Sequence, residues 1–332
     1  MKAFILDRYG KKQALRYGDM PDPVPGPDDV VVEVEAAGLN QLDSKIRDGA
    51  FKPILPYKPP LVLGHDLAGS VIKTGANVRR FKVGDAVYAR PRDGQIGAFA
   101  ERIAVKESDL AVKPADLSMA EAASIPLVGL TAWQALVERA QIKPGQKVLI
   151  HAGSGGVGTF AIQLAKHLGA IVATTASVAN AAMLKELEAD VVIDYRSQKF
   201  EEELSNYDVV LNSLDATTLE KSLKVLKPGG KLISISGPPD PAFARAQGLN
   251  AVLRLVLRLL SSAIRHKAKR AGVDYSFLFM RADGRQLEQT QLIENGTIRP
   301  VVDRTFAFEK LNEAFAYINT GRAKGKVVVT LK

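Results

Sequence analysis

A chain of 332 residues with 46% hydrophobic residues and few aromatic ones is typical of a soluble globular protein of roughly two domains, which excludes disordered and fibrous classes. The absence of cysteine excludes disulfide bonds and thiolate metal sites. The net charge of +9 is concentrated in residues 241–275, which hold seven basic side chains against one aspartate, so we do not expect a general nucleic-acid-binding surface.

The sequence shows neither a signal peptide nor a membrane span. The N-terminus has only a short apolar run, Ala3–Leu6, before Asp7, which is not the core of a signal peptide. The uncharged residues 122–137 include Pro126 and Gly129 and fall short of the ~20 residues that a membrane span needs. We therefore expect a cytoplasmic protein.

The first 115 or so residues are predicted to form short strands joined by turns. Strands are expected at 2–6, 30–36, 69–73 and 86–89, and eight prolines lie between positions 21 and 60. This pattern predicts a compact β-rich domain. Near its end, Ser118 and Glu121 form a capping-box pattern that opens a helix.

A glycine-rich stretch follows the apolar run 148–150. Gly153, Gly155 and Gly158 fit the pattern G-x-G-x-x-G, and a helix and a second strand at 171–175 come after it. In such a unit the glycines allow a tight turn, the approach of a pyrophosphate and close packing of the helix, whose N-terminus favours the phosphate. We expect a dinucleotide-binding site; the alternative is a glycine turn of purely structural origin.

The next segments alternate between strands and helices. Strands are expected at 191–193, 207–211 and 231–235, with helices at 179–187 and 217–226, the second opened by a capping box from Thr217 to Glu220. This alternation predicts a parallel, doubly wound sheet. Further strands are expected at 275–280 and at 327–329, and the last of these is expected to return to the first domain.

Residues 249–270 are predicted to form an amphipathic basic helix. Its apolar residues recur at helical spacing at Leu253, Val256, Leu257, Leu260 and Ile264, and its basic residues lie on other faces at Arg254, Arg258, Arg265 and Lys269. Such a helix can cover a substrate cleft, contact a second subunit, lie on an anionic membrane surface, or simply pack on its own domain. Because it precedes the last strand of the nucleotide domain, we favour the cleft-lining or subunit-contact role over membrane binding.

The order and spacing of these motifs resemble the medium-chain dehydrogenase/reductase superfamily. The segments that carry the resemblance are Gly38–Asp43, Leu63–Gly69, Val83–Val87, Gly129–Ala132, the glycine loop, Lys227–Gly230 and Gly321–Lys326. Within it, the chain is most similar to the zinc-free quinone and enone reductases, including mitochondrial reticulon-interacting oxidoreductases and enoyl-reductase modules of polyketide synthases. The resemblance implies an α/β fold: a Rossmann doubly wound parallel sheet at 122–298, and a β-rich GroES-like substrate domain from 1–121 and 299–332. We also expect a homodimer.

The zinc branch of this superfamily has a cysteine at the position of Asn40, another further along, and a histidine at His65. Only the histidine is present, and one imidazole without a thiolate partner does not make a tetrahedral zinc site. We therefore expect no metal. His65 is expected to be a hydrogen-bonded packing residue, with Asp66 either its partner or a solvated charge.

Without zinc, the carbonyl oxygen of a substrate must be polarised by hydrogen-bond donors. The resemblance points to Asn40, which matches the family pattern N-x-x-D together with Asp43; the alternative is an amide that caps a loop. Lys45 is a candidate proton donor or oxyanion partner, and equally a solvated charge. Tyr57 is a weaker candidate, for which we favour a packing role.

The resemblance also implies which residues bind the cofactor. The pyrophosphate is expected at Ser154, Gly155, Gly156 and Val157. The nicotinamide side is expected at Thr131 and Asn212, and the wall that closes over it at Phe279 and Lys326. By contrast, His151 and His167 are expected to be structural.

The cofactor is expected to be NADPH rather than NADH. An acidic residue that binds the ribose is expected about 20 residues after the glycine loop, yet no Asp or Glu occurs between Gly158 and Lys185. By resemblance, Ser177 and Tyr195 meet the adenosine 2′-phosphate instead. The family often has a lysine near Asn180, and its absence weakens this part of the resemblance.

These features together predict an NADPH-dependent reductase. Its hydride is expected to go to the β-carbon of an α,β-unsaturated ketone or aldehyde, or to a quinone, followed by protonation. The alternative is an NADPH-binding sensor or nucleic-acid-binding protein with little turnover, and the missing cysteines count against a zinc-dependent alcohol dehydrogenase. The physiological substrate does not follow from the sequence, because fold does not fix function.

Overall fold

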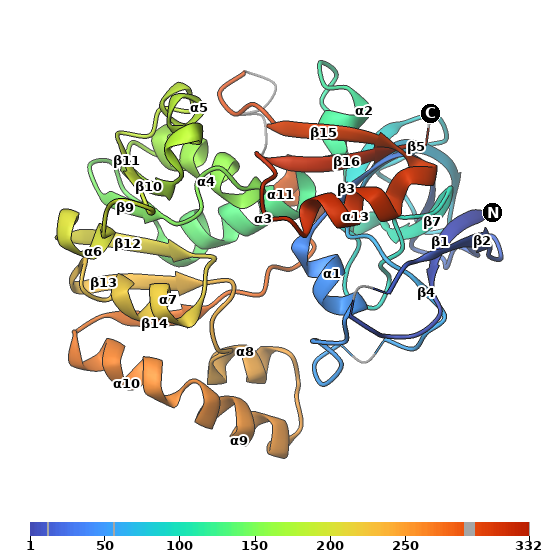
Figure 1. The fold of residues 1–332 in the computed structure, drawn as a ribbon. Helices are drawn as coiled ribbons and strands as arrows, with labels where there is room; N and C mark the ends of the chain where they lie inside the picture. Colours follow the sequence, from blue (N-terminus) through green and yellow to red (C-terminus); the bar gives the residue numbers. More distant parts are fainter. Residues whose placement is uncertain (12, 56, 289–295, 332) are drawn as a thin grey trace. The chain divides into compact units, whose positions relative to one another are not determined.

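The computed structural model describes residues 1–11, 13–55, 57–288 and 296–331. The chain divides into two compact units, one of Met1–Leu130 with Arg281–Lys332 and one of Thr131–Met280 (Figure 1). These boundaries differ from those expected at 121/122 and 298/299. The described residues after Met280 belong to the first unit because they pack on its sheet, where the Tyr88 hydroxyl donates a hydrogen bond to the Leu287 carbonyl.

The first unit is mainly β-structure. Its strands are β1 (Lys2–Leu6), β2 (Arg16–Asp19), β3 (Asp29–Leu39), β4 (Leu61–Val62), β5 (Asp66–Thr74), β6 (Ala86–Ala89), β7 (Arg102–Lys106), β8 (Leu110–Val112), β15 (Val302–Ala307) and β16 (Lys326–Thr330). Its helical segments are α1 (Gln41–Arg47), η1 (Glu107–Asp109), α2 (Met119–Ala123), α3 (Pro126–Trp133), which crosses into the second unit, α11 (Gly284–Glu288), η4 (Phe308–Lys310) and α13 (Leu311–Ile318).

Two sheets organise this unit. One has the order β2-β1-β4, and the other has the order β15-β16-β3-β5-β6-β8, with β7 also paired to β3. β16 runs antiparallel to β3, with Val327 opposite Leu39 and Val328 opposite Gly38. The expectation that 327–329 returns to the first domain is therefore confirmed.

The second unit is a parallel sheet with helices. Its strands are β9 (Lys147–Ile150), β10 (Ile171–Ala176), β11 (Val191–Asp194), β12 (Tyr207–Asn212), β13 (Leu226–Ser234) and β14 (Asp274–Phe277). Its helical segments are η2 (Gln134–Ala140), α4 (Gly156–His167), η3 (Val178–Asn180), α5 (Ala181–Glu186), α6 (Phe200–Glu203), α7 (Ala216–Ser222), α8 (Pro241–Ala246), α9 (Ala251–Leu260) and α10 (Ser262–Arg270). The strand order is β11-β10-β9-β12-β13-β14 and every pairing is parallel, so the predicted doubly wound sheet is confirmed.

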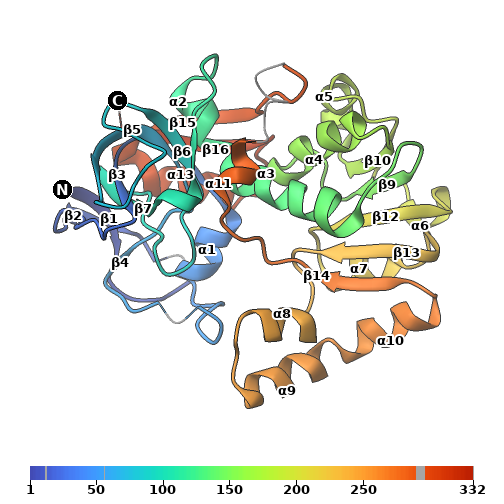
Figure 2. The same cartoon turned by 180° about the vertical axis from the view of Figure 1, so that it is seen from behind.

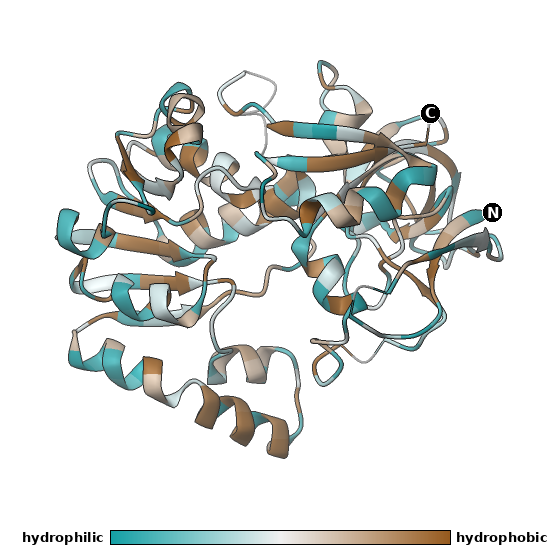
Figure 3. Ribbon diagram, viewed as in Figure 1, coloured by the Kyte–Doolittle hydropathy of each residue, from teal (hydrophilic) through white to brown (hydrophobic). Residues whose placement is uncertain are grey.

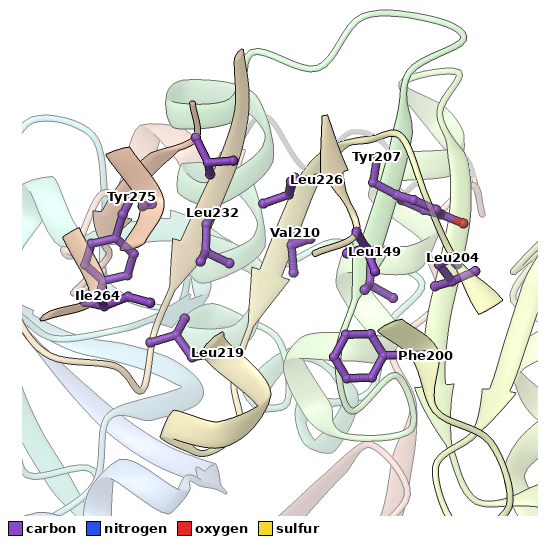
Figure 4. Packing of buried hydrophobic residues seen from close by; sticks show 14 of the residues in the cluster. Leu149, Phe200, Leu204, Tyr207, Val210, Leu219, Leu226, Leu232, Ile264 and Tyr275 are labelled. Atoms are coloured by element: carbon purple, nitrogen blue, oxygen red, sulfur yellow. The ribbon is translucent and has the colours of Figure 1, made fainter. Parts of the chain in front are cut away.

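One row of buried side chains crosses this sheet in register. The row consists of Ala173, Leu149, Val210, Leu232 and Tyr275, each the pairing partner of the next. Register partners lie on the same face of a sheet, so these residues form one continuous apolar surface. Side chains from α6, α7 and α10 cover it (Figure 4). The apolar runs that predict the strands therefore also build the core.

The capping predictions have different outcomes. The capping box at Ser118 is confirmed, because Glu121 N donates to the Ser118 hydroxyl and the Glu121 carboxylate accepts from Ser118 N. The capping box expected at Thr217 is wrong. Helix α7 begins one residue earlier, and Asp215 caps it by accepting from Thr218 N. Asp is as good an N-cap as Thr, and here it precedes the helix.

The segment 249–270 forms two helices, α9 and α10, where a single one was expected. They meet at Ser261, whose buried hydroxyl donates to the Leu257 carbonyl. Helix α10 lies beside the edge strand β14, whereas α9 lies beside α8 (Figures 1 and 2). Among the described residues, no helix combines the length and the apolar character of a membrane-crossing segment.

Candidate functional site

The glycine-rich stretch lies at the point where the strand order of the parallel sheet reverses. It follows β9, which pairs with β10 on one side and with β12 on the other. In such sheets ligands bind at the carboxyl ends of the strands, at this reversal. The loop from His151 to Gly155 leaves β9 at that end and leads directly into α4.

The three glycines have different structural roles. A Cβ on Gly158 would collide with the Ala152 carbonyl oxygen, and a Cβ on Gly153 would collide with the Thr174 hydroxyl. A Cβ on Gly155 would meet only the Ala152 carbonyl oxygen, at 3.3 Å. Gly153 and Gly158 are therefore required by packing within the protein, whereas the space beside Gly155 is open to a ligand. The backbone turn falls on Ala152, whose φ is 53°, and not on a glycine as expected.

The first turn of α4 has the character of an anion site. Its N-cap residue is Gly155, which supplies no side-chain cap, and the first turn contains no acidic residue. The N–H groups of a first helical turn have no partner within the helix, and the helix dipole favours negative charge there. The four residues expected at the pyrophosphate, Ser154, Gly155, Gly156 and Val157, all lie at this N-terminus.

Asn212 ends β12, which is the neighbour of β9, and its side chain is fully buried. Its Oδ1 accepts from Leu214 N at 3.1 Å and from the Ser236 hydroxyl at 3.2 Å. Its Nδ2 has no hydrogen-bond partner among the described residues. A buried donor without an acceptor is unfavourable, so this amide fits a ligand that brings an acceptor. Thr131, the other residue expected on this side, is also buried.

A second polar group gathers at the ends of β10 and β11. Ser177 follows β10, Tyr195 follows β11, and Tyr195 N donates to the Ala176 carbonyl at 3.2 Å. Arg196 was missed by the sequence analysis. Its guanidinium lies 5.9 Å from the centre of the Tyr195 ring, and no described carboxylate forms an ion pair with it. The signal that would have identified it is a cation directly after Tyr195, in a chain that has no acidic residue between Gly158 and Lys185.

The first unit contains a buried polar cluster formed by Asn40, Asp43, His65, Asp66 and Lys326. Asn40 links its two halves. Asn40 N donates to Asp43 Oδ2 and its Nδ2 donates to Asp66 Oδ2, both at 2.9 Å. The Lys326 ammonium donates to Asn40 Oδ1 at 2.5 Å and to Asp66 Oδ2 at 2.8 Å.

The structure corrects the expectation for Asp66. His65 Nδ1 lies 2.5 Å from Asp43 Oδ1, so the partner of the histidine is Asp43. Asp66 is neither that partner nor solvated, because it is buried and accepts from Lys326, Asn40 and, at 2.7 Å, from Leu127 N. The reason is local: Asp43 is the third residue of α1, whose capping box turns its carboxylate back toward Asn40. The expectation that His65 is a hydrogen-bonded, buried residue is confirmed.

This cluster does not fit a zinc ion. The Lys326 ammonium already neutralises Asp66 and would repel a dication placed beside it. His65 contributes one imidazole, and no cysteine exists anywhere in the chain. Within the described ranges no group of three His, Asp or Glu side chains is arranged to hold a metal.

The remaining predicted residues lie in different settings. Lys45 is exposed on α1 and forms no ion pair with a described carboxylate. The Tyr57 hydroxyl accepts from Gly94 N at 3.1 Å, and burial raises the pKa of Tyr57 to about 12, so it stays protonated at neutral pH. Phe279 is half-buried, with its ring 5.8 Å from that of Phe243.

The two histidines expected to be structural differ in burial. His151 lies under the glycine loop, and its ring nitrogens contact the hydroxyls of Thr175 at 3.2 Å and Ser222 at 2.9 Å. Burial lowers the pKa of His151 to about 4, so the imidazole is neutral. His167 is exposed at the end of α4.

Comparison with known families matches both parts of the chain. Residues 26–115 match the family described as "Alcohol dehydrogenase GroES-like domain". Residues 187–329 match the family described as "Zinc-binding dehydrogenase". The second description refers to the family, whereas the residues of this chain do not fit the metal.

Individual relatives cover nearly the whole chain. The mitochondrial NAD(P)H oxidoreductase RTN4IP1 of Danio rerio is 34% identical over 100% of this chain and 91% of its own length. The 2-methylene-furan-3-one reductase of Solanum lycopersicum is 36% identical over 99% of this chain and 79% of its own length. Among solved structures, the quinone oxidoreductase of Coxiella burnetii has a TM-score of 0.87 and 30% identity, covering 100% of this chain and 99% of its own.

Proposed function

The chain belongs to the medium-chain dehydrogenase/reductase family, and from this membership we propose that it is an NADPH-dependent reductase of activated C=C bonds or quinones. Two of the relatives described above are named for related activities, one as a reductase of a methylene-furanone and one as a quinone oxidoreductase. The substrate class that we propose for this chain rests on its similarity to these two proteins.

The observation that best supports a bound nicotinamide cofactor is the unpartnered Nδ2 of Asn212 beside the glycine loop. Both features follow paired strands, with Leu211 opposite Ile150, so they lie at the same edge of the sheet. Gly155 leaves room for a pyrophosphate, and the buried amide is suited to a carboxamide oxygen. The residues at this edge therefore fit the cofactor.

The preference for NADPH over NADH is supported by the other end of the site. The chain has no acidic residue between Gly158 and Lys185 to accept from a ribose hydroxyl. Ser177, Tyr195 and Arg196 instead offer hydroxyl groups and a cation. The acidic residue directly before Tyr195 is Asp194. Its carboxylate accepts hydrogen bonds from Arg196 N and the Ser197 hydroxyl, so it is engaged within its own turn. An arginine here suits a 2′-phosphate.

Bound NADPH supplies the hydride. The chain's own residues bind and orient the cofactor and the substrate, and they polarise the substrate oxygen. We assign Ser154, Gly155, Gly156 and Val157 to the pyrophosphate, and Thr131, Asn212, Phe279 and Lys326 to the nicotinamide side. Asn40, Lys45 and Tyr57 are the proposed groups that stabilise negative charge on the substrate oxygen or deliver the proton.

The buried cluster refines the role of Asn40. Both polar atoms of its side chain are already engaged, by Lys326 and by Asp66. Lys326 uses two of its three N–H bonds in contacts with described residues. These contacts leave one N–H bond of the Lys326 ammonium unused, and Asn40 and Asp66 hold the ammonium in one orientation.

The test is NADPH oxidation with a panel of enones, enals and quinones. We expect turnover with at least one of these classes and tighter binding of NADPH than of NADH. Tight NADPH binding without turnover on any member of the panel would favour the sensor alternative. Binding of neither nucleotide would overturn the proposal.

Two variants test the substrate side. Lys45→Ala should lower kcat more than it weakens NADPH binding, because removing an oxyanion donor costs up to ~2.7–4 kcal/mol in favourable cases. Asn40→Ala should have the same effect, because it releases the Lys326 ammonium that Asn40 holds in place. Lys73→Ala, which removes an exposed lysine on β5, is the matched control for Lys45. Wild-type turnover in Asn40→Ala or Lys45→Ala would remove that residue from the mechanism.

A further inference from the structure

Helix α9 exposes most of its aliphatic side chains. Val252 is 71% exposed, Leu255 56%, Leu259 63% and Leu260 61%, and Val256 is also exposed. Leu257 is the only buried residue of this fully described helix. Figure 3 shows α9 as an almost continuously apolar helix beside the more polar α10. Of the five apolar residues that recur at helical spacing in the sequence, Val256 and Leu260 are therefore exposed, whereas Leu257 and Ile264 are buried.

The exposed residues form one face of the helix. Val252, Leu255, Val256 and Leu259 follow the spacing i, i+3, i+4, i+7, which places side chains on one side of an α-helix. The helix is fixed to its own unit through Leu257 and through contacts with α8 and α10. A contiguous exposed aliphatic face of this kind marks an interaction surface more often than isolated exposed residues do.

The surroundings of this face are strongly basic. From residue 241 to 273 the chain has seven Lys and Arg side chains and no Asp or Glu. Among the described residues, Lys267 is the only one of the seven that forms an ion pair, with Glu220. Arg254, Arg258, Lys269 and Arg270 are exposed, so their charges are available to an external partner.

Charge decides which partner fits. A second copy of the chain would bring two basic segments of equal sign together, with no acidic residue in either to offset the repulsion. An anionic lipid surface satisfies both features at once, because the acyl region takes up the aliphatic face and the phosphates take up the arginines. Long arginine side chains on the polar face of such a helix reach the headgroups by extending along it.

We propose that α9, with the basic side chains of α9 and α10, docks the protein on the surface of an anionic membrane. The helix lies in the interface with its aliphatic face toward the acyl chains. The docking is peripheral and reversible, and its strength depends on the content of anionic lipid and on ionic strength. This surface is independent of the proposed reaction.

Cosedimentation of the full-length protein with vesicles tests the proposal. We expect binding to vesicles that contain phosphatidylserine and little binding to pure phosphatidylcholine. The double variant Leu255→Ser/Leu259→Ser should bind at least about tenfold more weakly, because it removes aliphatic groups that would enter the bilayer. Arg254→Gln and Arg258→Gln should each weaken binding about fivefold. NADPH binding should be unchanged in all of these variants.

Matched controls remove equally exposed groups elsewhere. Val24→Ser/Val83→Ser removes two aliphatic side chains that are 88% and 65% exposed, and Lys73→Gln/Lys82→Gln removes two exposed charges. Both should bind vesicles like the wild type. Equal binding to the two kinds of vesicle, or unchanged binding by Leu255→Ser/Leu259→Ser, would overturn the proposal. So would a wild-type dimer in sedimentation velocity that this variant converts to a monomer, since a second copy would then cover the face.

Discussion

Lys326 and Asp66 form a buried ion pair across the first unit, with the ammonium 2.8 Å from the carboxylate and both side chains at most 6% exposed. The two residues lie 260 positions apart in the sequence. Asn40 contacts both of them, so the three side chains hold one another in a single arrangement. Burying two charges is unfavourable unless each is paired and hydrogen-bonded, and here the cluster provides those bonds.

Lys326→Met should lower the free energy of unfolding by about 3–5 kcal/mol, because it leaves the Asp66 carboxylate buried without its cation. Adding Asp66→Asn should recover part of this loss by removing the unpaired charge. Urea unfolding measures both. Lys45→Met, at an exposed lysine, is the control and should change stability by less than about 0.5 kcal/mol. If Lys326→Met were as stable as the double variant Lys326→Met/Asp66→Asn, this account of the ion pair would be contradicted.

Gly155→Ala and Gly158→Ala should separate binding from folding. A methyl group on Gly155 meets only the Ala152 carbonyl oxygen, at 3.3 Å, so this variant should keep nearly the wild-type melting temperature but bind NADPH at least about tenfold more weakly. A methyl group on Gly158 collides with backbone atoms of the loop, so this variant should lose stability by about 1–3 kcal/mol. Calorimetry and nucleotide titration measure the two effects. Unchanged NADPH affinity in Gly155→Ala would place the phosphate elsewhere.

Arg196→Gln should weaken NADPH binding about tenfold and leave NADH binding nearly unchanged, because only NADPH carries the 2′-phosphate that the guanidinium would contact. Lys199→Gln, three residues further on, is the control. Its ammonium is already paired with Glu202, so its loss should affect both nucleotides equally and weakly. Parallel weakening of NADPH and NADH by Arg196→Gln would show that the arginine does not distinguish them.

His151 should make the folded protein less stable in acid. Its pKa is lowered to about 4 by burial, whereas the unfolded chain protonates this imidazole near 6.5. The unfolded state therefore binds more protons between these values, so the neutral-pH stability is fully present above 6.5 and falls as the pH drops toward 4. Between about pH 7.5 and about pH 5 this group alone accounts for about 2 kcal/mol.

The His151→Gln variant isolates this effect. Its free energy of unfolding should be lower than wild type at neutral pH and should change less over the same pH range. His167→Gln, at an exposed histidine, should keep the wild-type slope. Identical slopes in wild type and His151→Gln would rule out His151 as the source of the pH dependence.

Turnover should persist in an excess of metal chelator. The Asp66 carboxylate beside Asn40 is paired with the Lys326 ammonium, and His65 is hydrogen-bonded to Asp43. The cluster therefore offers no set of zinc ligands. Elemental analysis of the purified protein before and after chelation, together with turnover, tests this. One tightly bound metal per chain that is lost together with activity would contradict it.

The sequence by itself determined the features that depend on neighbouring residues. The apolar run 148–150, the three glycines and the helix after them predict one strand-loop-helix unit, because strand and helix periodicity and glycine turns are local properties. The Ser118 capping box was predictable for the same reason, since its hydrogen bonds join residues three positions apart.

Only the tertiary structure decided which distant groups become partners. Lys326 meets Asn40 across 286 residues because β16 pairs with β3 and places Val327 opposite Leu39. Asp66 is next to His65 in the sequence, yet in the fold the Asp66 carboxylate pairs with Lys326. The hydrogen-bond partner of His65 is Asp43. The aliphatic spacing of α9 was visible in the sequence as well. Whether such a face is packed or exposed depends on what the fold brings against it, and here the fold leaves it uncovered.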